Sequence, residues 1–548
     1  MKDINTIPET ETSTILEQHQ RLSQSQLWKL QRTFYEQRGI RAWSQDTTPH
    51  YLTSNPFIAN AYGKVVFGFL RDWHTFASAS LDTSQPVYII ELGAGSGRFS
   101  YYFLKKFMDF FTRSALKEIP IKYVMTDFSE QNLAFWQQHP SLQAFIEQGI
   151  LDFAYFDVTQ PQELMLRHAK TVLSSATIKN PLVLLANYIF DSIPQDCFML
   201  KDGQLHESLV TLSSSKPEPD LNDPALLYSL KPSYDHYPIN ADYYNDPDFN
   251  QVLHSYQQQF PNTTFLFPHV ALRCLHFFRD LSGGRLLLLS GDQGYSQEED
   301  LQSRRPLSVG IHSGAFSMMV NYHAIGEYVR NQGGQVLHMA HRHSWLHVSA
   351  YLLGQHPTDY LETAQSFHEA IEQWGPDDFF TFFAAITHKA TMKAYDALSL
   401  SQLLAWLRLS GWDCYSFLAF FPFLLKKLET SSKAELQALY QVIQHIWDTY
   451  YHIGEKRDLA YALGILLYNM KYSTEALDFF QRSLELYGPH QNTFYYMAKC
   501  HSALQRTEDA LACLDQMLQL HPSFEPAQAI RLELQSQLQP NLRPEAAF

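Results

Sequence analysis

The stretch Val87–Ser100 reads VYIIELGAGSGRFS, and it decides the fold of the chain. Its first four residues form an apolar run that is typical of a buried strand in a parallel sheet. An acid and three alternating glycines follow, and Phe99–Phe111 then shows apolar side chains at helical spacing. Glycine lets a backbone approach a ligand closely, and a helix start offers free N–H groups. Because open parallel sheets bind ligands at the carboxyl ends of their strands, we expect the glycine turn to be a binding site.

The spacing of Gly93, Gly95 and Gly97 indicates the kind of ligand. Dinucleotide-binding turns place the third glycine one position later, which argues against a nicotinamide oxidoreductase. The Gly-x-Gly-x-Gly spacing, with Glu91 two residues earlier, resembles motif I of class I S-adenosylmethionine-dependent methyltransferases. The resemblance implies S-adenosyl-L-methionine as the cofactor, with Glu91 at its ammonium group and the turn, Ala94 included, around its methionine and ribose. A tight turn that binds nothing is the alternative.

Polar side chains follow three further predicted strands. The strands and the polar residues after them are Ile121–Met125 with Asp127, Leu151–Phe156 with Asp157, and Leu182–Ala186 with Asn187. We expect Asp127 to accept hydrogen bonds from the ribose hydroxyls of the cofactor and Asp157 to face its adenine. We expect Asn187 to contact the cofactor and to orient the methyl acceptor. Helix capping or a turn is the structural alternative for each of the three.

A longer resemblance narrows the family. The run Ala186–Pro194 resembles the Asn-Glu-Phe-Phe-Asp-Ala-Leu-Pro signature of the MidA-like methyltransferases. That family includes the mitochondrial complex I assembly arginine methyltransferase. Tyr51–Trp73, Leu286–Tyr295 and His312–His338 resemble further segments of the family in the same order. The resemblance covers about residues 45–354.

The chain departs from this family on the acceptor side. Tyr188 stands where the family has an acid that could polarise a guanidinium, which argues against an arginine substrate. Ser317 and Asn321 stand at or near two later acids of the family. The sequence shows no convincing general base, and Asp191 is expected to cap the helix that follows it.

Composition limits the class of protein. The formal net charge is −15 and basic residues form no long stripe, so nucleic acid is a poor partner. The five cysteines show no Cys-x-x-Cys spacing, which predicts reduced thiols and a cytoplasmic protein. We expect no secretory signal in residues 1–20 and no membrane-spanning segment.

Periodicity predicts helices over residues 14–38, about Ile58–Trp73, and Pro161–Leu173. Residues 213–262 form a polar, aromatic-rich insert that we interpret as an ordered lid. The histidines from His338 to His347 invite a metal site, with His343 and His347 on one helix face, but surface or packing roles are favoured and no metal is expected.

An internal repeat marks the C-terminal part. Glu475-Ala476-Leu477 recurs as Asp509-Ala510-Leu511, an offset of 34 residues that matches the tetratricopeptide period. The small side chains of Ala476 and Ala510 would let the two helices of each hairpin approach closely. Because stable arrays usually need three or more repeats, the preceding helices are expected to belong to the same stack. A surface that recruits a protein or peptide is the functional interpretation, and a stabilising or dimerising appendage is the alternative.

The sequence thus predicts an α/β protein, with a Rossmann-like methyltransferase sheet and helices on both faces, followed by an all-α repeat domain. The expected segments are an N-terminal helical segment (1–45), a methyltransferase domain (46–356), a helical region (357–450), tetratricopeptide-like repeats (451–535) and a flexible tail (536–548). The predicted activity is methyl transfer to a protein side-chain nitrogen. A methyltransferase-fold scaffold without activity is the second hypothesis.

Overall fold

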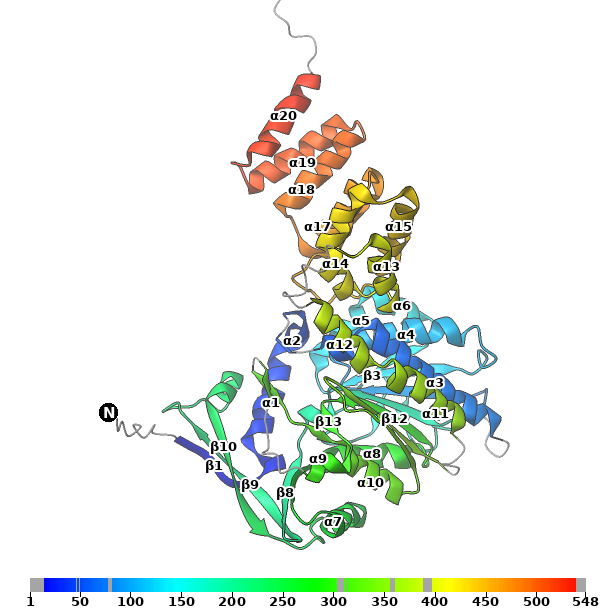
Figure 1. Cartoon of the computed structure of the whole chain (residues 1–548), viewed down its shortest axis with the longest axis vertical. Coiled ribbons are helices and arrows are strands. Elements are labelled where there is room, and N and C mark those ends of the chain that lie inside the picture. The colour runs from blue at the N-terminus through cyan, green and yellow to red at the C-terminus, as the bar shows by residue number, and fades with distance from the viewer. Residues whose placement is uncertain are drawn as a thin grey trace, which may run out of the picture. The chain divides into compact units, whose positions relative to one another are not determined.

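Figure 1 shows the computed structural model of the chain, which describes residues 14–45, 47–48, 50–76, 81–302, 310–312, 314–354, 360–387 and 397–538. The chain divides into two compact units, with the boundary between Thr381 and Phe382. Most of the expected flexible tail lies outside the described residues.

A seven-stranded sheet forms the centre of the first unit (Figure 1). Its strands, in spatial order, are β17 (Gln335–His338), β18 (His347–Leu353), β12 (Leu286–Asp292), β7 (Leu182–Asn187), β2 (Val87–Leu92), β3 (Ile121–Asp127) and β4 (Leu151–Tyr155). The five from β12 to β4 run parallel, whereas β18 is antiparallel to both of its neighbours. The four strands predicted from Val87 to Ala186 are therefore confirmed, and every residue of β2 and β12 is buried, as expected between two helical layers.

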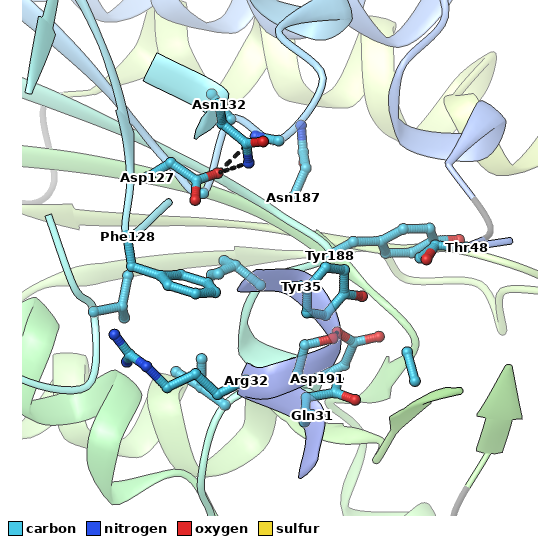
Figure 2. A pocket seen from close by; sticks show the side chains of 18 of the residues that line it. Gln31, Arg32, Tyr35, Thr48, Asp127, Phe128, Asn132, Asn187, Tyr188 and Asp191 are labelled. Carbon is cyan, nitrogen blue, oxygen red and sulfur yellow. Dashed lines mark hydrogen bonds between the residues drawn. The ribbon is translucent and has the colours of Figure 1, made fainter. Parts of the chain in front are cut away.

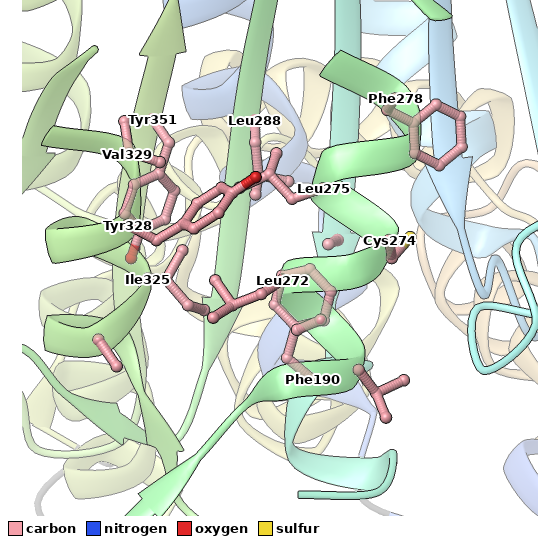
Figure 3. Close-up of a cluster of buried hydrophobic side chains, with 14 of the residues drawn as sticks. Phe190, Leu272, Cys274, Leu275, Phe278, Leu288, Ile325, Tyr328, Val329 and Tyr351 are labelled. Carbon is pink, nitrogen blue, oxygen red and sulfur yellow. The ribbon is translucent and has the colours of Figure 1, made fainter. Parts of the chain in front are cut away.

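Different helices cover the two faces of this sheet. α3 (Pro56–Thr75) contacts both α4 (Arg98–Phe111) and α11 (Leu361–Phe367) on one face. On the other face, α8 (His269–Leu281) and α10 (Tyr322–Asn331) pack apolar side chains against the sheet, as Figure 3 shows. Successive strand residues point to opposite faces, so each strand contributes to both layers.

A second sheet, fully antiparallel, carries much of the predicted insert. It contains β1 (Thr14–Arg21), β8 (Asp196–Lys201), β9 (Gln204–Ser214), β10 (Leu230–Pro238) and β11 (Thr263–Phe267). The insert of residues 213–262 contributes β10, the 3₁₀ segment η4 (Pro224–Ser229) and α7 (Pro247–Gln259). More than half of the insert therefore has regular secondary structure, and its strand β10 extends this sheet.

Of the helix predictions, the one over residues 14–38 is wrong in part and the one over Pro161–Leu173 is wrong throughout. Residues 14–21 pair with β9 as strand β1, and the helix α1 (Gln26–Arg38) begins only after Ser25, whose hydroxyl accepts the Leu27 N–H. Pairing across the sheet thus overrides the local helical pattern. Within Pro161–Leu173 the chain forms two short paired strands, β5 (Leu164–Met165) and β6 (Val172–Leu173).

A buried carboxylate explains the second difference. Asp152 is fully buried and accepts the backbone N–H groups of His168 and Ala169 at 2.8 and 2.9 Å. Lys170 follows with a φ of 53°. These contacts fix a tight turn where a helix would need an uninterrupted hydrogen-bond ladder.

The histidine cluster has a packing role. His347 begins β18 and His343 lies in the irregular segment before that strand, so the predicted shared helix face is wrong. The hydroxyl of Ser349 lies 2.8 Å from His338 Nδ1 and 2.9 Å from His347 Nε2. Within the described ranges, no group of three or more His, Cys, Asp or Glu side chains is placed to hold a metal ion.

Smaller elements complete the described part of the first unit. They are η1 (Leu22–Gln24), α2 (Arg41–Ser44), η2 (Tyr51–Thr53), α5 (Glu130–Gln138), α6 (Pro140–Glu147), η3 (Phe190–Ser192), β13 (Gly294–Tyr295), α9 (Glu298–Gln302), β14 (Gly310–His312), β15 (Ala315–Ser317), β16 (Val320–Asn321) and the π-helical η5 (His368–Gln373). Helix α12 (Pro376–Thr387) crosses the boundary between the units.

The second unit is helical throughout its described residues. Its helices are α13 (Leu400–Leu409), α14 (Cys414–Lys427), α15 (Lys433–Asp448), α16 (Leu459–Asn469), α17 (Ser473–Tyr487), α18 (Gln491–Ala503), α19 (Thr507–Leu520) and α20 (Glu525–Leu538), with the 3₁₀ turn η7 (Leu428–Thr430). α16 packs on α17 and α18 packs on α19, and α19 begins 34 residues after α17. A Cβ added at Gly464 would lie 2.7 Å from the Phe480 ring, so a small residue is required where the first pair of helices touches.

No helix in the described part of the chain combines the length and the apolar character needed to cross a lipid bilayer.

Candidate functional site

A cavity of about 580 Å³ opens at the carboxyl ends of β2, β3, β4 and β7 (Figure 2). Seven of the eight residues predicted to bind a cofactor line it, namely Glu91, Gly93, Ala94, Gly95, Asp127, Asp157 and Asn187. The eighth, Gly97, stands at the start of α4 with a φ of 78° and does not line the cavity. The sheet therefore brings together residues that are up to 96 positions apart, counted from Glu91 to Asn187.

The glycine turn needs glycine for two different reasons. Gly93 and Gly95 have φ values of 61° and 54°, in the left-handed region that disfavours other residues. A Cβ added at Gly93 would lie 2.7 Å from Ile189, and one at Gly95 would lie 2.8 Å from the Trp43 indole. The N–H of Ala94 donates to Thr126 at 2.9 Å, which ties the turn to the neighbouring strand.

Glu91 is a buried acid at the end of β2. Its side chain accepts hydrogen bonds from the hydroxyls of Ser100 and Tyr123, the latter at 2.6 Å. Only 3% of the residue is exposed, and this burial raises the pKa of Glu91 to about 7. The carboxyl group can therefore ionise within the neutral range when a cation approaches.

Asp127 holds the turn from the end of β3. It accepts the Gly95 N–H at 3.1 Å, the Ser129 N–H at 2.9 Å and the Asn132 amide at 3.1 Å, the last drawn in Figure 2. Burial raises the pKa of Asp127 to about 6. The Asn132 Oδ1 atom is buried and has no hydrogen-bond partner among the described residues. A ligand hydroxyl beside Asp127 could supply that missing donor.

Asp157 forms an ion pair that sequence reasoning missed. Arg32 of α1 donates to its carboxylate at 2.5 Å and lies 4.7 Å from the centre of the Phe128 ring. Hydrogen bonds from Thr159 and Arg32 lower the pKa of Asp157. Asp157 thus keeps its negative charge and anchors the N-terminal helix beside the cavity.

Asn187 lies at the end of β7 and is oriented by α3. The Tyr62 hydroxyl donates to Asn187 Oδ1 at 2.9 Å. The Nδ2 atom of Asn187 is buried, without a hydrogen-bond partner in the described residues. An unsatisfied buried donor in a cavity wall is costly unless a ligand accepts its hydrogen bond.

Tyr188 follows in a strained backbone conformation. Its φ is 50°, uncommon for a residue other than glycine, and its side chain lines the cavity. Burial raises the pKa of Tyr188 well above its usual value, so the phenol stays neutral. Of the two later departures from the family, Ser317 lines the cavity, whereas Asn321 caps α10 through the Ala324 N–H and does not line it.

The prediction that Asp191 caps the following helix is wrong, because Asp191 lies inside the short helix η3 itself. Its buried side chain lies next to that of Asp292 of β12. Burial raises the pKa of Asp191 to about 6 and raises that of Asp292 further, with the neighbouring acid as the second cause. Asp191 lines the cavity and Asp292 does not. The hydroxyl of Ser192 donates to Asp191 at 2.7 Å. No local sequence pattern predicts this pair, because its members are 101 positions apart.

The N-terminal segment forms a wall of the cavity, and no sequence pattern predicts this role. Trp28, Gln31, Arg32, Tyr35 and Trp43 line it from α1 and α2. Gln31 fixes the helix by donating to the Phe316 carbonyl at 2.6 Å and accepting the Phe316 N–H at 2.8 Å. Aromatic residues at Trp28, Tyr35 and Trp43 are visible in the sequence, but their spacing carries no sign of a binding wall.

None of the insert residues 213–262 lines this cavity. Tyr244 and Phe249 of the insert line a second cavity of about 600 Å³, together with Arg21 and His269. Thr159, Gln160 and Pro194 line both cavities, so the two adjoin.

Part of the chain, including most of the strand ends around the cavity, matches a known protein family. Residues 69–307 match a family model described as "putative S-adenosyl-L-methionine-dependent methyltransferase". A search of curated proteins gave no match.

Two solved structures from Burkholderia thailandensis are each 13% identical to this chain. One, an uncharacterized ACR, COG1565 superfamily protein, covers 61% of this chain and 87% of its own, with a TM-score of 0.36. The other, described as a COG1565 superfamily member and "likely methyl transferase" bound to S-adenosyl-homocysteine, covers 65% and 85%, with a TM-score of 0.37.

The family match spans the glycine turn and the strand ends that follow it. S-adenosyl-L-methionine, the cofactor expected from the sequence, is the one that this family names, and the match supports a methyltransferase family that uses it.

Proposed function

We propose that the first unit is an S-adenosyl-L-methionine-dependent methyltransferase that acts on a side-chain nitrogen of a protein. The observation that carries the proposal is the cavity in which Glu91, the glycine turn and Asp127 meet, within the segment that matches the methyltransferase family. The position at the carboxyl ends of parallel strands is where open α/β sheets bind ligands.

The polar groups of the cavity fit this cofactor. In its ionised form, Glu91 would hold the ammonium group, and Asp127 with the unpaired Asn132 Oδ1 would take the ribose hydroxyls. Phe128 and Asp157 would border the adenine. When bound, the cofactor supplies a methyl group activated by a positively charged sulfur. The chain itself orients the two reactants and excludes water from them.

Asn187 is the proposed acceptor-orienting residue. Tyr62 fixes its amide oxygen, so the amide nitrogen is left to donate into the cavity. We propose that the helices α16 to α19 are tetratricopeptide-like repeats that bind the protein carrying the acceptor. All five cysteines are free thiols, which suits a cytoplasmic protein.

The direct test is methyl transfer from labelled S-adenosyl-L-methionine to proteins that co-purify with the full chain, followed by mass spectrometry of the modified residues. We expect labelled nitrogen in wild type and none with Gly95→Asp, because the new side chain would meet Trp43. Gly149→Asp is the matched control, since Gly149 also has a positive φ, of 71°, but nothing lies within 4 Å of an added Cβ. Transfer that persists in Gly95→Asp would contradict the proposal.

A scaffold without activity is the second candidate. The close packing of Trp43 on Gly95 favours it, because the indole narrows the space above the turn. Binding of S-adenosyl-homocysteine without transfer to any co-purified protein would support the scaffold.

A further inference from the structure

The cavity wall beyond the ends of β3 and β4 combines an aromatic ring with a carboxylate. Phe128 directly follows Asp127, the proposed partner of the ribose hydroxyls, and Asp157 stands just after the neighbouring strand β4. Nucleobases stack on aromatic rings, and a carboxylate can accept a hydrogen bond from the 6-amino group of adenine. This part of the cavity is therefore where the adenine of the proposed cofactor would lie.

The Arg32 guanidinium makes both of the contacts that adenine would make there. Its central carbon lies 4.7 Å from the centre of the Phe128 ring, and Figure 2 shows the two side chains together. Its Nη1 donates to Asp157 Oδ2 at 2.5 Å. The other oxygen, Asp157 Oδ1, accepts the N–H and the hydroxyl of Thr159 at 2.9 and 2.6 Å. Asp157 Oδ2 is thus the oxygen left for a ligand amino group, and Arg32 takes it.

Guanidinium and adenine would compete for this place because their shapes are alike. Both are planar, donate N–H groups from the edge of the plane and stack on aromatic rings. A base that entered between the Arg32 guanidinium and the Phe128 ring would need two layers of contact, about 7 Å in all. The observed 4.7 Å leaves no such room, so adenine can use this face of Phe128 only after the guanidinium has left.

The surroundings of Arg32 allow it to leave. Its side chain is 37% exposed, whereas that of Asp157 is 12% exposed. Glu36, one turn later on α1, accepts the Arg32 Nε–H at 2.8 Å and stays within reach of Arg32 in another rotamer. Gln31 holds α1 through two hydrogen bonds to the Phe316 backbone. A rotation of the Arg32 side chain, without movement of the helix, is therefore enough to free the Phe128 face.

We propose that the Arg32 guanidinium occupies the subsite for adenine and is displaced when the cofactor binds. The inference rests on the proposed function and adds to it a group of the chain itself that competes with the cofactor. The apparent dissociation constant rises by the inverse of the fraction of molecules in which the subsite is free. A guanidinium that is seated in about nine-tenths of the molecules thus weakens cofactor binding about tenfold.

Calorimetric titration of the full chain with S-adenosyl-homocysteine tests this competition. Arg32→Ala is expected to bind about tenfold more tightly than wild type. Arg32→Lys keeps a charge for Asp157 but has no planar face for Phe128, so its affinity is expected to fall between the two. Arg38→Ala, on the same helix but outside the cavity lining, is the matched control and should bind as wild type does.

The direction of the change separates competition from a structural role. If Arg32 only fixed α1 or covered the bound adenine, its removal would weaken binding. Weaker or unchanged binding in Arg32→Ala would therefore overturn the inference and leave the proposed function standing, because wild type still binds. If neither wild type nor Arg32→Ala bound the ligand, the proposed function would fail, and the inference with it.

A crystal structure of wild type with S-adenosyl-homocysteine gives an independent measurement. We expect the adenine against Phe128, its amino group at Asp157, and the Arg32 side chain turned away from both. A bound ligand beside an Arg32 that still contacts Phe128 and Asp157 would overturn the inference.

Discussion

At the scale of single residues, the proposed contact between Glu91 and the cofactor would make cofactor binding depend on pH. Burial raises the pKa of Glu91 from 4.5 in the unfolded chain to about 7, so folding favours the protonated form of its side chain. This contribution to stability is full below pH 4.5 and is lost as the pH rises through about 7. A ligand ammonium group favours the ionised form of Glu91, whereas burial favours its protonated form, so the two have opposite effects on the pKa of Glu91.

We predict that S-adenosyl-homocysteine binds more tightly as the pH rises from 6 to about 7, and that its affinity is flat above that value. The slope approaches about tenfold per pH unit at most when one proton is released on binding. Calorimetry between pH 6 and 8 measures it. Glu91→Gln should bind more weakly and lose the slope in this range. A slope that survives in Glu91→Gln would remove Glu91 from the ammonium site.

The sequence predicted the polar residues at strand ends well and their partners poorly. Glu91, Asp127 and Asn187 were found because each stands one or two residues after an apolar run, and the register of a parallel sheet then brings strand ends together. Arg32 and Asp292 were missed, because side-chain contacts between segments that are distant in the sequence leave no local pattern.

At the scale of elements, the N-terminal helix α1 is part of the site. Its role depends on Gln31, which makes two hydrogen bonds to the Phe316 backbone, and on Arg32, which pairs with Asp157. The sequence predicted a helix over residues 14–38 but not its start, because residues 14–21 pair with strand β9 as strand β1. Tertiary pairing of this kind cannot be read from local propensity.

Gln31→Leu is expected to weaken S-adenosyl-homocysteine binding about tenfold, because the Phe316 N–H and carbonyl lose their partners and α1 is no longer fixed. The same change should lower the free energy of unfolding by about 2–3 kcal/mol. Gln37→Leu, at an exposed position of the same helix, serves as the control and should affect neither quantity. Unchanged affinity in Gln31→Leu would show that α1 does not support the site.

At the scale of the whole molecule, the chain joins an α/β unit to a helical unit with separate cores. Calorimetric unfolding of the full chain should show two transitions, and S-adenosyl-homocysteine should raise only that of the first unit. Gly464→Ala should lower only the transition of the second unit, because the added Cβ meets Phe480 at 2.7 Å. Gly488→Ala, with an open position and a φ of 80°, is the control for backbone strain alone. A single unfolding transition that shifts both with S-adenosyl-homocysteine and with Gly464→Ala would contradict the division into two units.

The coarse order of the chain, sheet first and helices afterwards, followed from hydropathy and the 34-residue offset. The second, antiparallel sheet did not, because two of its strands, β1 and β10, are mostly polar and contain no buried residue. The other three strands bury apolar side chains, but the pairing joins segments that are far apart in the sequence, and such pairing leaves no local pattern.

The most direct test is a crystal structure of the full chain grown with saturating S-adenosyl-homocysteine. We expect the ligand in the 580 Å³ cavity, with its amino group beside Glu91 and its ribose hydroxyls beside Asp127. A cavity that stays empty at saturation, or a ligand bound elsewhere on the chain, would contradict the account.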